Sequence, residues 1–301
     1  MDWHQSQLSK NEFVTTIEGV SITIKREDLL HPAISGNKYR KLKHNFLDLP
    51  KNLEGVYTFG GAYSNHLVAT AAAGHLHGIP TYGFVRGDEL KDHVRNPSLA
   101  YCEQQGMKLI FLSRDDYRKK EQAPSVLSLC RKKNILGIPE GGTNELALKG
   151  CREILTESDK RFTAVCCAVG TGGTLMGMMQ SGNAKQHFLG IQVVRDQKVS
   201  QWLINNTPAH VDLNLLSEFD FGGYAKVPDE LVDFINTFYK SYQILLDPIY
   251  TGKLLFGIFA LIKSGQWRWG KKVLIIHTGG IQGIKGFNQK QQQKGNQCIE
   301  Y

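Results

Sequence analysis

The sequence predicts an α/β protein in which helices cover parallel β-sheets. Short runs rich in β-branched residues alternate along the chain with stretches of helical composition. Three of these runs lead directly into a glycine-rich turn and then into a helix-like segment. The 301 residues are 41% hydrophobic and 21% charged, which excludes a disordered, collagen-like or coiled-coil chain.

The expected strands and helices follow from this alternation. We expect strands at 20–24, 56–59, 81–85, 108–112, 164–169, 189–194 and 273–276. The clearest helical stretches between them are 66–77 and 145–155. In open α/β sheets, ligands bind at the carboxyl ends of the strands. The glycine-rich turns after 59, 169 and 276 are therefore where we expect the chemistry.

Composition and charge restrict the partners. The longest apolar run, 254–262, is far shorter than the roughly 20 residues that span a bilayer, so we expect no membrane partner. Six cysteines without CxxC spacing, and an amino-terminal segment without an apolar stretch, indicate reduced thiols in a cytoplasmic protein. The net charge is +8, but the basic residues are dispersed and the Lys/Gln-rich stretch 285–294 resembles a frayed tail. We therefore expect no nucleic-acid partner.

The first candidate motif comprises Gly170, Thr171, Gly172, Gly173 and Thr174. It follows an apolar strand and precedes a helix-like segment. Free N–H groups and the helix dipole at such a turn would hold a phosphate. The motif is neither a dinucleotide fingerprint, which would need glycine at 175, nor a P-loop. Taken alone, it could equally be a tight turn without a ligand.

The second candidate motif is SGNKYRKL, 35–42, which contains Lys38 and Lys41. Crowding by like charge, together with burial, would make the amine of Lys38 easier to deprotonate. A lysine that forms an imine needs that property. An exposed, basic start of a helix is the alternative.

The third candidate motif is GGAYSNH, 60–66. Ser64 would cap the following helix. The same helix start would also present N–H groups, together with Asn65 and His66, to an anionic group such as a carboxylate.

Two further segments precede or follow apolar elements. DPIYTGK, 247–253, contains Tyr250 and Thr251, and HTGG, 277–280, contains Thr278. A core position for Tyr250 and a capping role for Thr251 are the alternatives to a functional one. We expect no metal site, because the two-residue spacing of His75 and His77 points them to different faces of a helix.

Together and in this order, the five motifs resemble those of pyridoxal-phosphate enzymes with the tryptophan-synthase-β-like fold, also called fold type II. Within them, the chain resembles the branch of 1-aminocyclopropane-1-carboxylate deaminase and D-cysteine desulfhydrase, over residues 24–280. The resemblance implies two open parallel-rich sheets with flanking helices, and pyridoxal 5'-phosphate as cofactor. It also implies a large domain of 1–51 and 140–301, a small inserted domain of 52–139, and a homodimer.

The resemblance also implies roles for individual residues. Lys38 matches the lysine that carries the cofactor and later moves the α-proton. Asn65 matches the residue bonded to the cofactor's phenolic oxygen. Residues that match the phosphate site are Gly170, Thr171, Gly172, Gly173, Thr174 and Lys41. Residues that match the substrate-carboxylate loop are Ser64, Asn65 and His66, and Tyr250 and Tyr224 match two active-site tyrosines, the latter by a looser motif.

Two positions indicate the branch. The deaminases have glutamate at the residue that contacts the pyridine nitrogen, where this chain has Thr251, and leucine where it has Thr278. A hydroxyl leaves that nitrogen more nearly neutral, which suits expulsion of a thiol better than opening of a cyclopropane. The resemblance therefore implies β-elimination from a D-amino acid, most simply D-cysteine, to pyruvate, sulfide and ammonia. The alternatives are 1-aminocyclopropane-1-carboxylate deaminase, a lyase acting on L-serine or L-threonine, and a non-catalytic cofactor-binding protein.

Overall fold

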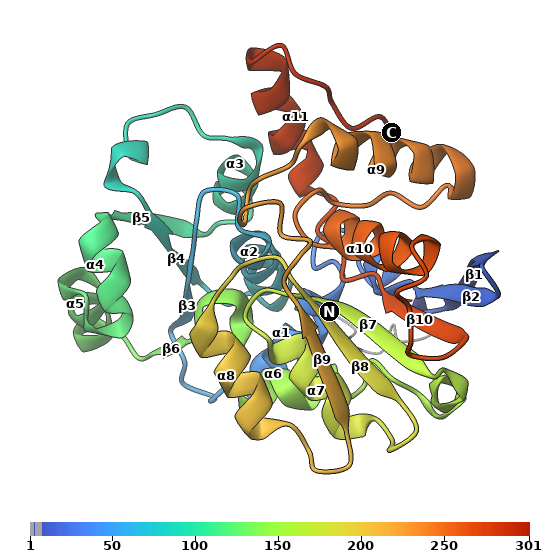
Figure 1. Ribbon diagram of the computed structural model, residues 1–301. Coiled ribbons are helices and arrows are strands. Elements are labelled where there is room, and N and C mark those ends of the chain that lie inside the picture. The colour runs from blue at the N-terminus through green and yellow to red at the C-terminus, as the bar shows by residue number, and fades with distance from the viewer. Residues whose placement is uncertain (1–2, 4–7) are drawn as a thin grey trace.

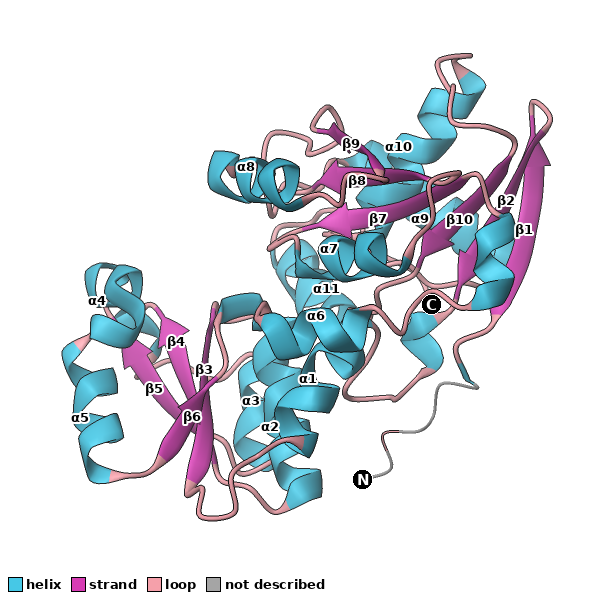
Figure 2. Ribbon diagram, turned by 90° about the horizontal axis from the view of Figure 1, so that it is seen from below, coloured by secondary structure: helices cyan, strands magenta, loops and turns pink. Residues whose placement is uncertain are grey.

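Two β-sheets organise the chain, and helices cover both faces of each sheet (Figures 1 and 2). The computed structural model describes residues 3 and 8–301. All strands except the first run parallel to their neighbours. The expected α/β class with parallel-rich sheets is confirmed.

The larger sheet has six strands in the order β1-β2-β10-β7-β8-β9. Their bounds are β1 Asn11–Ile17, β2 Val20–Lys25, β7 Ala164–Val169, β8 His187–Gln192, β9 Asp212–Leu216 and β10 Lys272–Ile276. The two edge strands, β1 and β9, were not predicted from the sequence. Both are only half-buried and mix polar with apolar residues, so neither has the continuous apolar pattern of a strand that is covered on both faces.

Side chains in the central strand β7 alternate between two hydrophobic cores. Cys166 packs with the core under α9 (Asp229–Tyr242) and α10 (Thr251–Lys263). Its neighbour Cys167 packs with the core under α6 (Glu145–Cys151) and α7 (Gly173–Ser181). This alternation is the period of two of a strand buried on both faces, and it places both cysteines in the core.

The smaller sheet has four parallel strands in the order β5-β4-β3-β6. Their bounds are β3 Gly55–Gly60, β4 Thr81–Arg86, β5 Lys108–Leu112 and β6 Ile135–Gly137. Figure 2 shows α4 and α5 on one face and α1, α2 and α3 on the other, with bounds α1 Asn37–Leu47, α2 Asn65–His77, α3 Pro97–Gln104, α4 Arg114–Lys119 and α5 Pro124–Lys132. These strands lie within 52–139, the expected inserted domain, whose exact boundaries stay a prediction.

Two segments differ from the expectation, and a third, 197–219, was assigned no element from the sequence. The Lys/Gln-rich stretch is not a frayed tail, because it forms α11 (Gly283–Gln293), whose Ile284 is fully buried. The side chain of Asn288 also exchanges two hydrogen bonds with the backbone of Ile299. The segment 197–219 contains α8 (Gln197–Asn206) and β9, and the helix expected at 145–155 ends at Cys151. None of the helices in the described part of the chain is long and apolar enough to span a membrane.

Close packing of α1 against α6 fixes the helix that carries Lys38. A Cβ at Gly150 in α6 would overlap the carbonyl oxygen of Arg40 in α1, so only glycine allows the two backbones to approach this closely. The Arg40 guanidinium, 2% exposed, forms an ion pair with the fully buried Glu27, with an Nε–Oε2 distance of 2.7 Å. These two contacts fix α1 against α6 and against the segment that follows β2.

We expect Gly150→Ala to lower the free energy of unfolding by about 3 kcal/mol or more, because α1 and α6 must separate. The matched control is Gly78→Ala, since a Cβ at Gly78 would meet nothing within 4 Å and only the left-handed φ of +66° is strained. That control should lose only about 1 kcal/mol. Urea denaturation measures both, and equal losses would show that the close approach is unimportant.

Candidate active site

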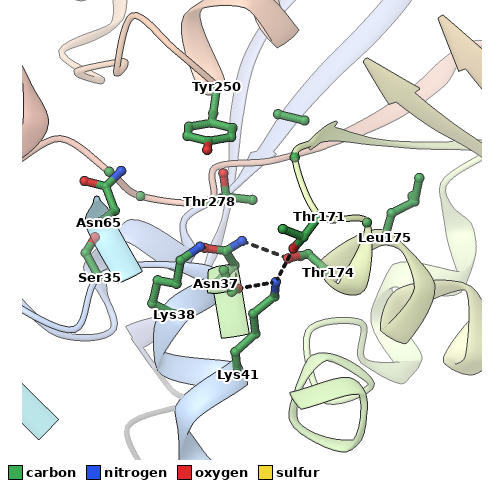
Figure 3. A pocket seen from close by; sticks show the side chains of 16 residues that line it. Ser35, Asn37, Lys38, Lys41, Asn65, Thr171, Thr174, Leu175, Tyr250 and Thr278 are labelled. Carbon is green, nitrogen blue, oxygen red and sulfur yellow. Dashed lines mark hydrogen bonds between the residues drawn. The ribbon is translucent and has the colours of Figure 1, made fainter. Parts of the chain in front are cut away.

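A pocket lies where strands of both sheets end, between α1, α2 and α7 (Figure 3). Its empty space of about 580 Å³ includes open solvent at its mouth. The turns after β3, β7 and β10 all contribute to it, as expected from the sequence. The lining residues are Ser35, Asn37, Lys38, Lys41, Asn65, Gly141, Ala168, Gly170, Thr171, Gly172, Thr174, Leu175, Tyr250, Thr278, Gly279 and Gly280.

The start of α1 is held against the turn after β10. Gly36 has a φ of +63°, and a Cβ there would overlap the carbonyl oxygen of Thr278. The N–H of Asn37 donates to that same oxygen at 3.2 Å. Two motifs that are some 240 residues apart in the sequence thus form one wall of the pocket. Glycine is required at position 36 for this contact.

The amine of Lys38 points into the pocket (Figure 3) and donates to Oδ1 of Asn37 at 3.2 Å. Burial, and then the positive charge of Lys41, lower the pKa of Lys38 to about 7. An ordinary lysine has a pKa about 3.5 units higher and is almost entirely protonated at neutral pH. Lys38 therefore has a large neutral, nucleophilic fraction near pH 7, as the sequence suggested for an imine-forming lysine.

Lys41 is a buried cation whose partners are neutral. Its side chain lies one turn along α1 from Lys38, and the residue is 2% exposed. Its Nζ donates to the Gly141 carbonyl at 2.8 Å and to the hydroxyls of Thr143 and Thr171 at 3.0 and 3.2 Å. Within residues 3 and 8–301, no carboxylate forms an ion pair with Lys38 or Lys41. Because an unpaired buried charge is costly, this arrangement favours binding of an anion.

The turn after β7 provides the backbone for such an anion. Gly172 has a φ of +79° and comes just before the first residue of α7, whose N-terminus points at the pocket. A Cβ at Gly173 would come within 2.6 Å of the Thr143 hydroxyl, so the loop has no room for side chains there. The Thr174 hydroxyl accepts from Nδ2 of Asn37 at 2.8 Å. Glycine amides, a helix N-terminus and Lys41 form the donor set that a phosphate requires.

The side chains at the start of α2 have different positions relative to the pocket. Ser64 caps the helix, and its hydroxyl accepts from the N–H of Leu67 at 3.3 Å. Asn65 lines the pocket, and its Oδ1 accepts from Gln282 at 3.2 Å. The carboxylate-loop motif thus brings Asn65 to the pocket wall, with Ser64 next to it.

His66 is placed differently from the sequence expectation. It is 2% exposed and does not line the pocket, and a Cβ at Gly142 would come within 2.8 Å of its ring. Burial, together with the charges of Lys38 and Lys41, lowers its pKa well below the ordinary value. His66 is therefore a neutral ring packed behind the loop. Its side chain therefore does not reach the pocket in which the motif predicts it to bind the substrate carboxylate.

Thr251 is also displaced from its expected role. It is fully buried and does not line the pocket, and its hydroxyl donates to Oδ1 of Asp247 at 2.7 Å. The Asp247 carboxylate accepts in addition from the N–H groups of Tyr250 and Thr251, at 3.0 and 2.8 Å. Thr251 therefore belongs to the cap of α10, which is the alternative considered above. The threonine that does line the pocket is Thr278.

Two tyrosines face each other above the pocket. The hydroxyls of Tyr250 and Tyr224 are 3.4 Å apart, and their rings meet edge to face with centroids 6.0 Å apart. Burial, and then the neighbouring Tyr224, raise the pKa of Tyr250 well above its ordinary value. Tyr250 lines the pocket, whereas Tyr224 is 42% exposed and reaches it through Tyr250. Both hydroxyls keep their protons at neutral pH.

Sequence reasoning missed the contributions of Gly141 and Thr143. Both lie after β6, the short strand that was not predicted, and both touch Lys41. A Cβ at Gly141 would also come within 2.6 Å of Thr171. The two adjacent glycines at 141–142 are a fourth glycine-rich turn between a strand and a helix, which is the signal that could have revealed them.

A family model for pyridoxal-phosphate dependent enzymes matches residues 4–279. The chain belongs to this family. It is 30% identical to a protein of Pyrococcus horikoshii named "Putative 1-aminocyclopropane-1-carboxylate deaminase", over 90% of this chain and 88% of that one. It is 28% identical to the bifunctional D-cysteine desulfhydrase/1-aminocyclopropane-1-carboxylate deaminase, mitochondrial, of Arabidopsis thaliana, over 88% of this chain and 74% of that one.

Solved structures agree with this pyridoxal-phosphate family. A crystal structure described as an ACC deaminase homologue covers 95% of this chain and 93% of its own, with a TM-score of 0.80 and 27% identity. Maize serine racemase covers 94% of this chain and 92% of its own with a TM-score of 0.68, but its 15% identity indicates a shared fold only. The family resemblance stated from the motifs is confirmed, as is the dependence on pyridoxal phosphate.

The residues of the pocket fit pyridoxal phosphate. The coenzyme has a phosphate, for which the unpaired Lys41 and the amides at 170–174 are suitable donors. It also has an aldehyde, for which the partly neutral amine of Lys38 is a suitable nucleophile. The remaining polar side chains on the wall, Asn65 and Thr278, are neutral groups that can bond to a ring.

The pKa of Lys38 can be tested in the cofactor-free protein. Only the neutral amine reacts with acetic anhydride, so we expect acetylation of Lys38 to rise through a midpoint near pH 7. Lys41→Met removes the neighbouring positive charge and should move that midpoint to higher pH. Quantitative mass spectrometry of the modified peptide gives the profile, with a short unstructured peptide that contains one lysine as the reference. A Lys38 midpoint equal to that of the reference peptide would contradict the electrostatics described here.

Proposed function

We propose that this enzyme is a lyase that catalyses β-elimination from a D-amino acid, with D-cysteine as the most suitable substrate. The reaction converts D-cysteine and water into pyruvate, hydrogen sulfide and ammonia. The observation that supports this choice is the polar lining of the pocket, which has the Thr278 hydroxyl but no acidic side chain. The nearby carboxylate of Asp247 already accepts four hydrogen bonds from the start of α10.

The neutral Thr278 hydroxyl affects the choice of reaction, because the groups around the coenzyme determine which leaving group can depart. Pyridoxal phosphate supplies an electron sink for the charge that develops at the α-carbon of an amino acid. A carboxylate partner strengthens that sink, whereas a hydroxyl leaves it weaker. A thiolate is a good leaving group and departs with a weaker sink, whereas opening a strained ring carbon–carbon bond needs a stronger one. The polar groups around the pocket therefore favour elimination of a thiol.

We assign Lys38 to proton transfer at the α-carbon. Its pKa of about 7 gives it a substantial neutral fraction, so the amine can accept a proton near neutral pH. The N–H groups at the start of α2, with Ser64 and Asn65, are suited to bind the substrate carboxylate, because a helix N-terminus favours an anion. This binding would orient the α-hydrogen toward Lys38.

Tyr250 is suited to act at the opposite side of the substrate. Its raised pKa keeps the phenol protonated. The hydroxyl donates to that of Tyr224 at 3.4 Å, and by turning from Tyr224 toward the substrate it would donate instead to the departing sulfur. Tyr224 supports it through the contact between the two hydroxyls. The cofactor-binding group that we propose is Lys38, Lys41, Asn65, Gly170, Thr171, Gly172, Gly173, Thr174 and Thr278.

A second candidate function is that of a 1-aminocyclopropane-1-carboxylate deaminase. The names of the relatives in Pyrococcus horikoshii and Arabidopsis thaliana favour it. A homodimer and a cytoplasmic location stay predictions that rest on the family resemblance and on the sequence.

The choice between the two reactions is tested with one purified, cofactor-loaded sample. We expect sulfide release from D-cysteine at least ten times faster than from L-cysteine, and little 2-oxobutyrate from 1-aminocyclopropane-1-carboxylate. Lys38→Ala should abolish turnover and the absorbance of the lysine-bound cofactor near the visible edge. Lys43→Ala, in the same helix, removes a lysine that pairs with Glu153 instead and should keep both.

Three results would reject the proposal. Release of 2-oxobutyrate without sulfide would establish the deaminase. Cofactor binding without any turnover would indicate a non-catalytic binder. Persistence of the visible band in Lys38→Ala would refute the assignment of the lysine.

A further inference from the structure

Another buried lysine, Lys253, lies outside the pocket, and the reaction described above does not use it. Lys253, in the first turn of α10, has no exposed surface. Its Nζ donates to the carbonyl oxygens of Asp220 at 2.8 Å, Gly223 at 2.7 Å and Tyr224 at 3.4 Å. A buried ammonium that donates to three carbonyls of one segment fixes the conformation of that segment.

That segment is the connection between β9 and α9, residues 217–228, which carries Tyr224. It has an irregular backbone, with φ of +54° at Phe221, +86° at Gly222 and +143° at Gly223. No regular ladder of hydrogen bonds holds it. Its conformation therefore depends on individual contacts.

Other contacts hold the part of this segment that precedes Tyr224. The Asp220 carboxylate pairs with Arg195 at 2.7 Å and accepts from the N–H of Gly222. A Cβ at Gly257 in α10 would come within 2.7 Å of the Phe219 ring, so that ring packs directly on the helix. The last of the carbonyls bonded to Lys253 belongs to Tyr224 itself.

We propose that Lys253 is a positioning residue that sets Tyr224 against Tyr250 in the active site. Tyr250 comes directly before the first residue of α10, and Lys253 is three residues further along. One rigid helix start thus carries Tyr250 and also the ammonium that holds the backbone of Tyr224. The 3.4 Å separation of the two hydroxyls follows from this shared support.

Charge is the reason why lysine suits this place. Burial lowers the pKa of Lys253 to about 8, while the carboxylates of Asp220 and Asp247 oppose that shift. The ammonium nevertheless predominates at neutral pH and donates charge-assisted bonds, which are stronger than neutral ones. An apolar side chain of similar length would fill the space, but it would leave the Tyr224 carbonyl without its donor. The carbonyls of Asp220 and Gly223 would keep one backbone donor each, from Gly223 and Lys226.

This inference rests on the proposed function, and a double-mutant cycle tests it. We expect Lys253→Met to lower kcat/KM for D-cysteine about tenfold, and Tyr224→Phe to lower it by a similar factor. If Lys253 acts through the Tyr224 hydroxyl, Lys253→Met should lower kcat/KM less than about twofold further in the Tyr224→Phe background. The control Lys263→Met, at the exposed far end of the same helix, should change nothing.

Two kinetic outcomes would overturn the inference. Equal losses from Lys253→Met in both backgrounds would show that the lysine only stabilises the fold. No loss from Tyr224→Phe would show that the hydroxyl has no part in the reaction.

Hydrogen exchange tests the same tether without turnover. In Lys253→Met, the backbone amides of 217–228 should exchange at least ten times faster than in the wild type, while those of 254–262 in α10 stay unchanged. Unchanged exchange in the loop, or an equal rise along α10, would contradict the proposal. If the wild type turns over no amino acid, the proposed function fails, whereas the exchange data still decide whether Lys253 holds the loop.

Discussion

Two lysine amines lie at the ends of parallel strands, and among the residues that the structure describes no carboxylate forms an ion pair with either. Lys38 and Lys41 lie one helical turn apart on α1, and their hydrogen-bond partners are amides, hydroxyls and a carbonyl. Removing such charges from water is costly unless an anion joins them. The other residues that line the pocket provide further donors for an anionic coenzyme, which would balance the charge of the two lysines. The same electrostatics keep the Lys38 amine partly neutral and so reactive.

The fold keeps Lys38 and Lys41 buried because α1 is closely packed against its neighbours and cannot move away from them. Gly36 lies directly on the Thr278 carbonyl, and Gly150 lies directly on the Arg40 carbonyl, so α1 is fixed against the turn after β10 and against α6. The buried pair of Arg40 and Glu27 anchors the same helix to the segment that follows β2. Close packing of α1 thus offsets the loss in folding free energy that burial of the two unpaired lysines causes. On the opposite wall, α10 supports Tyr250 directly and, as we propose, Tyr224 through Lys253.

Much of this arrangement was accessible from the sequence, because buried parallel strands are nearly continuous apolar runs and the glycine-rich turns mark where they end. The edge strands β1 and β9 could not be predicted in this way, since a half-exposed strand contains polar residues and lacks the continuous apolar pattern. Thr251 and Thr278 show a different limit. Both are threonines in suitable motifs, and only the three-dimensional arrangement reveals that the hydroxyl of Thr251 is taken by Asp247. Likewise, the burial of His66 depends on Gly142, which is 76 residues away in the sequence.

The most direct test of the account is the identity of the lysine that carries the coenzyme. Borohydride reduction of the protein as purified with pyridoxal phosphate fixes the coenzyme to the amine that holds it, and tandem mass spectrometry of the digested protein locates the modified residue. The account predicts stoichiometric modification of Lys38, with Lys41 and Lys253 unmodified. Modification of another lysine instead, or an unmodified Lys38 in protein that retains bound coenzyme, would contradict it.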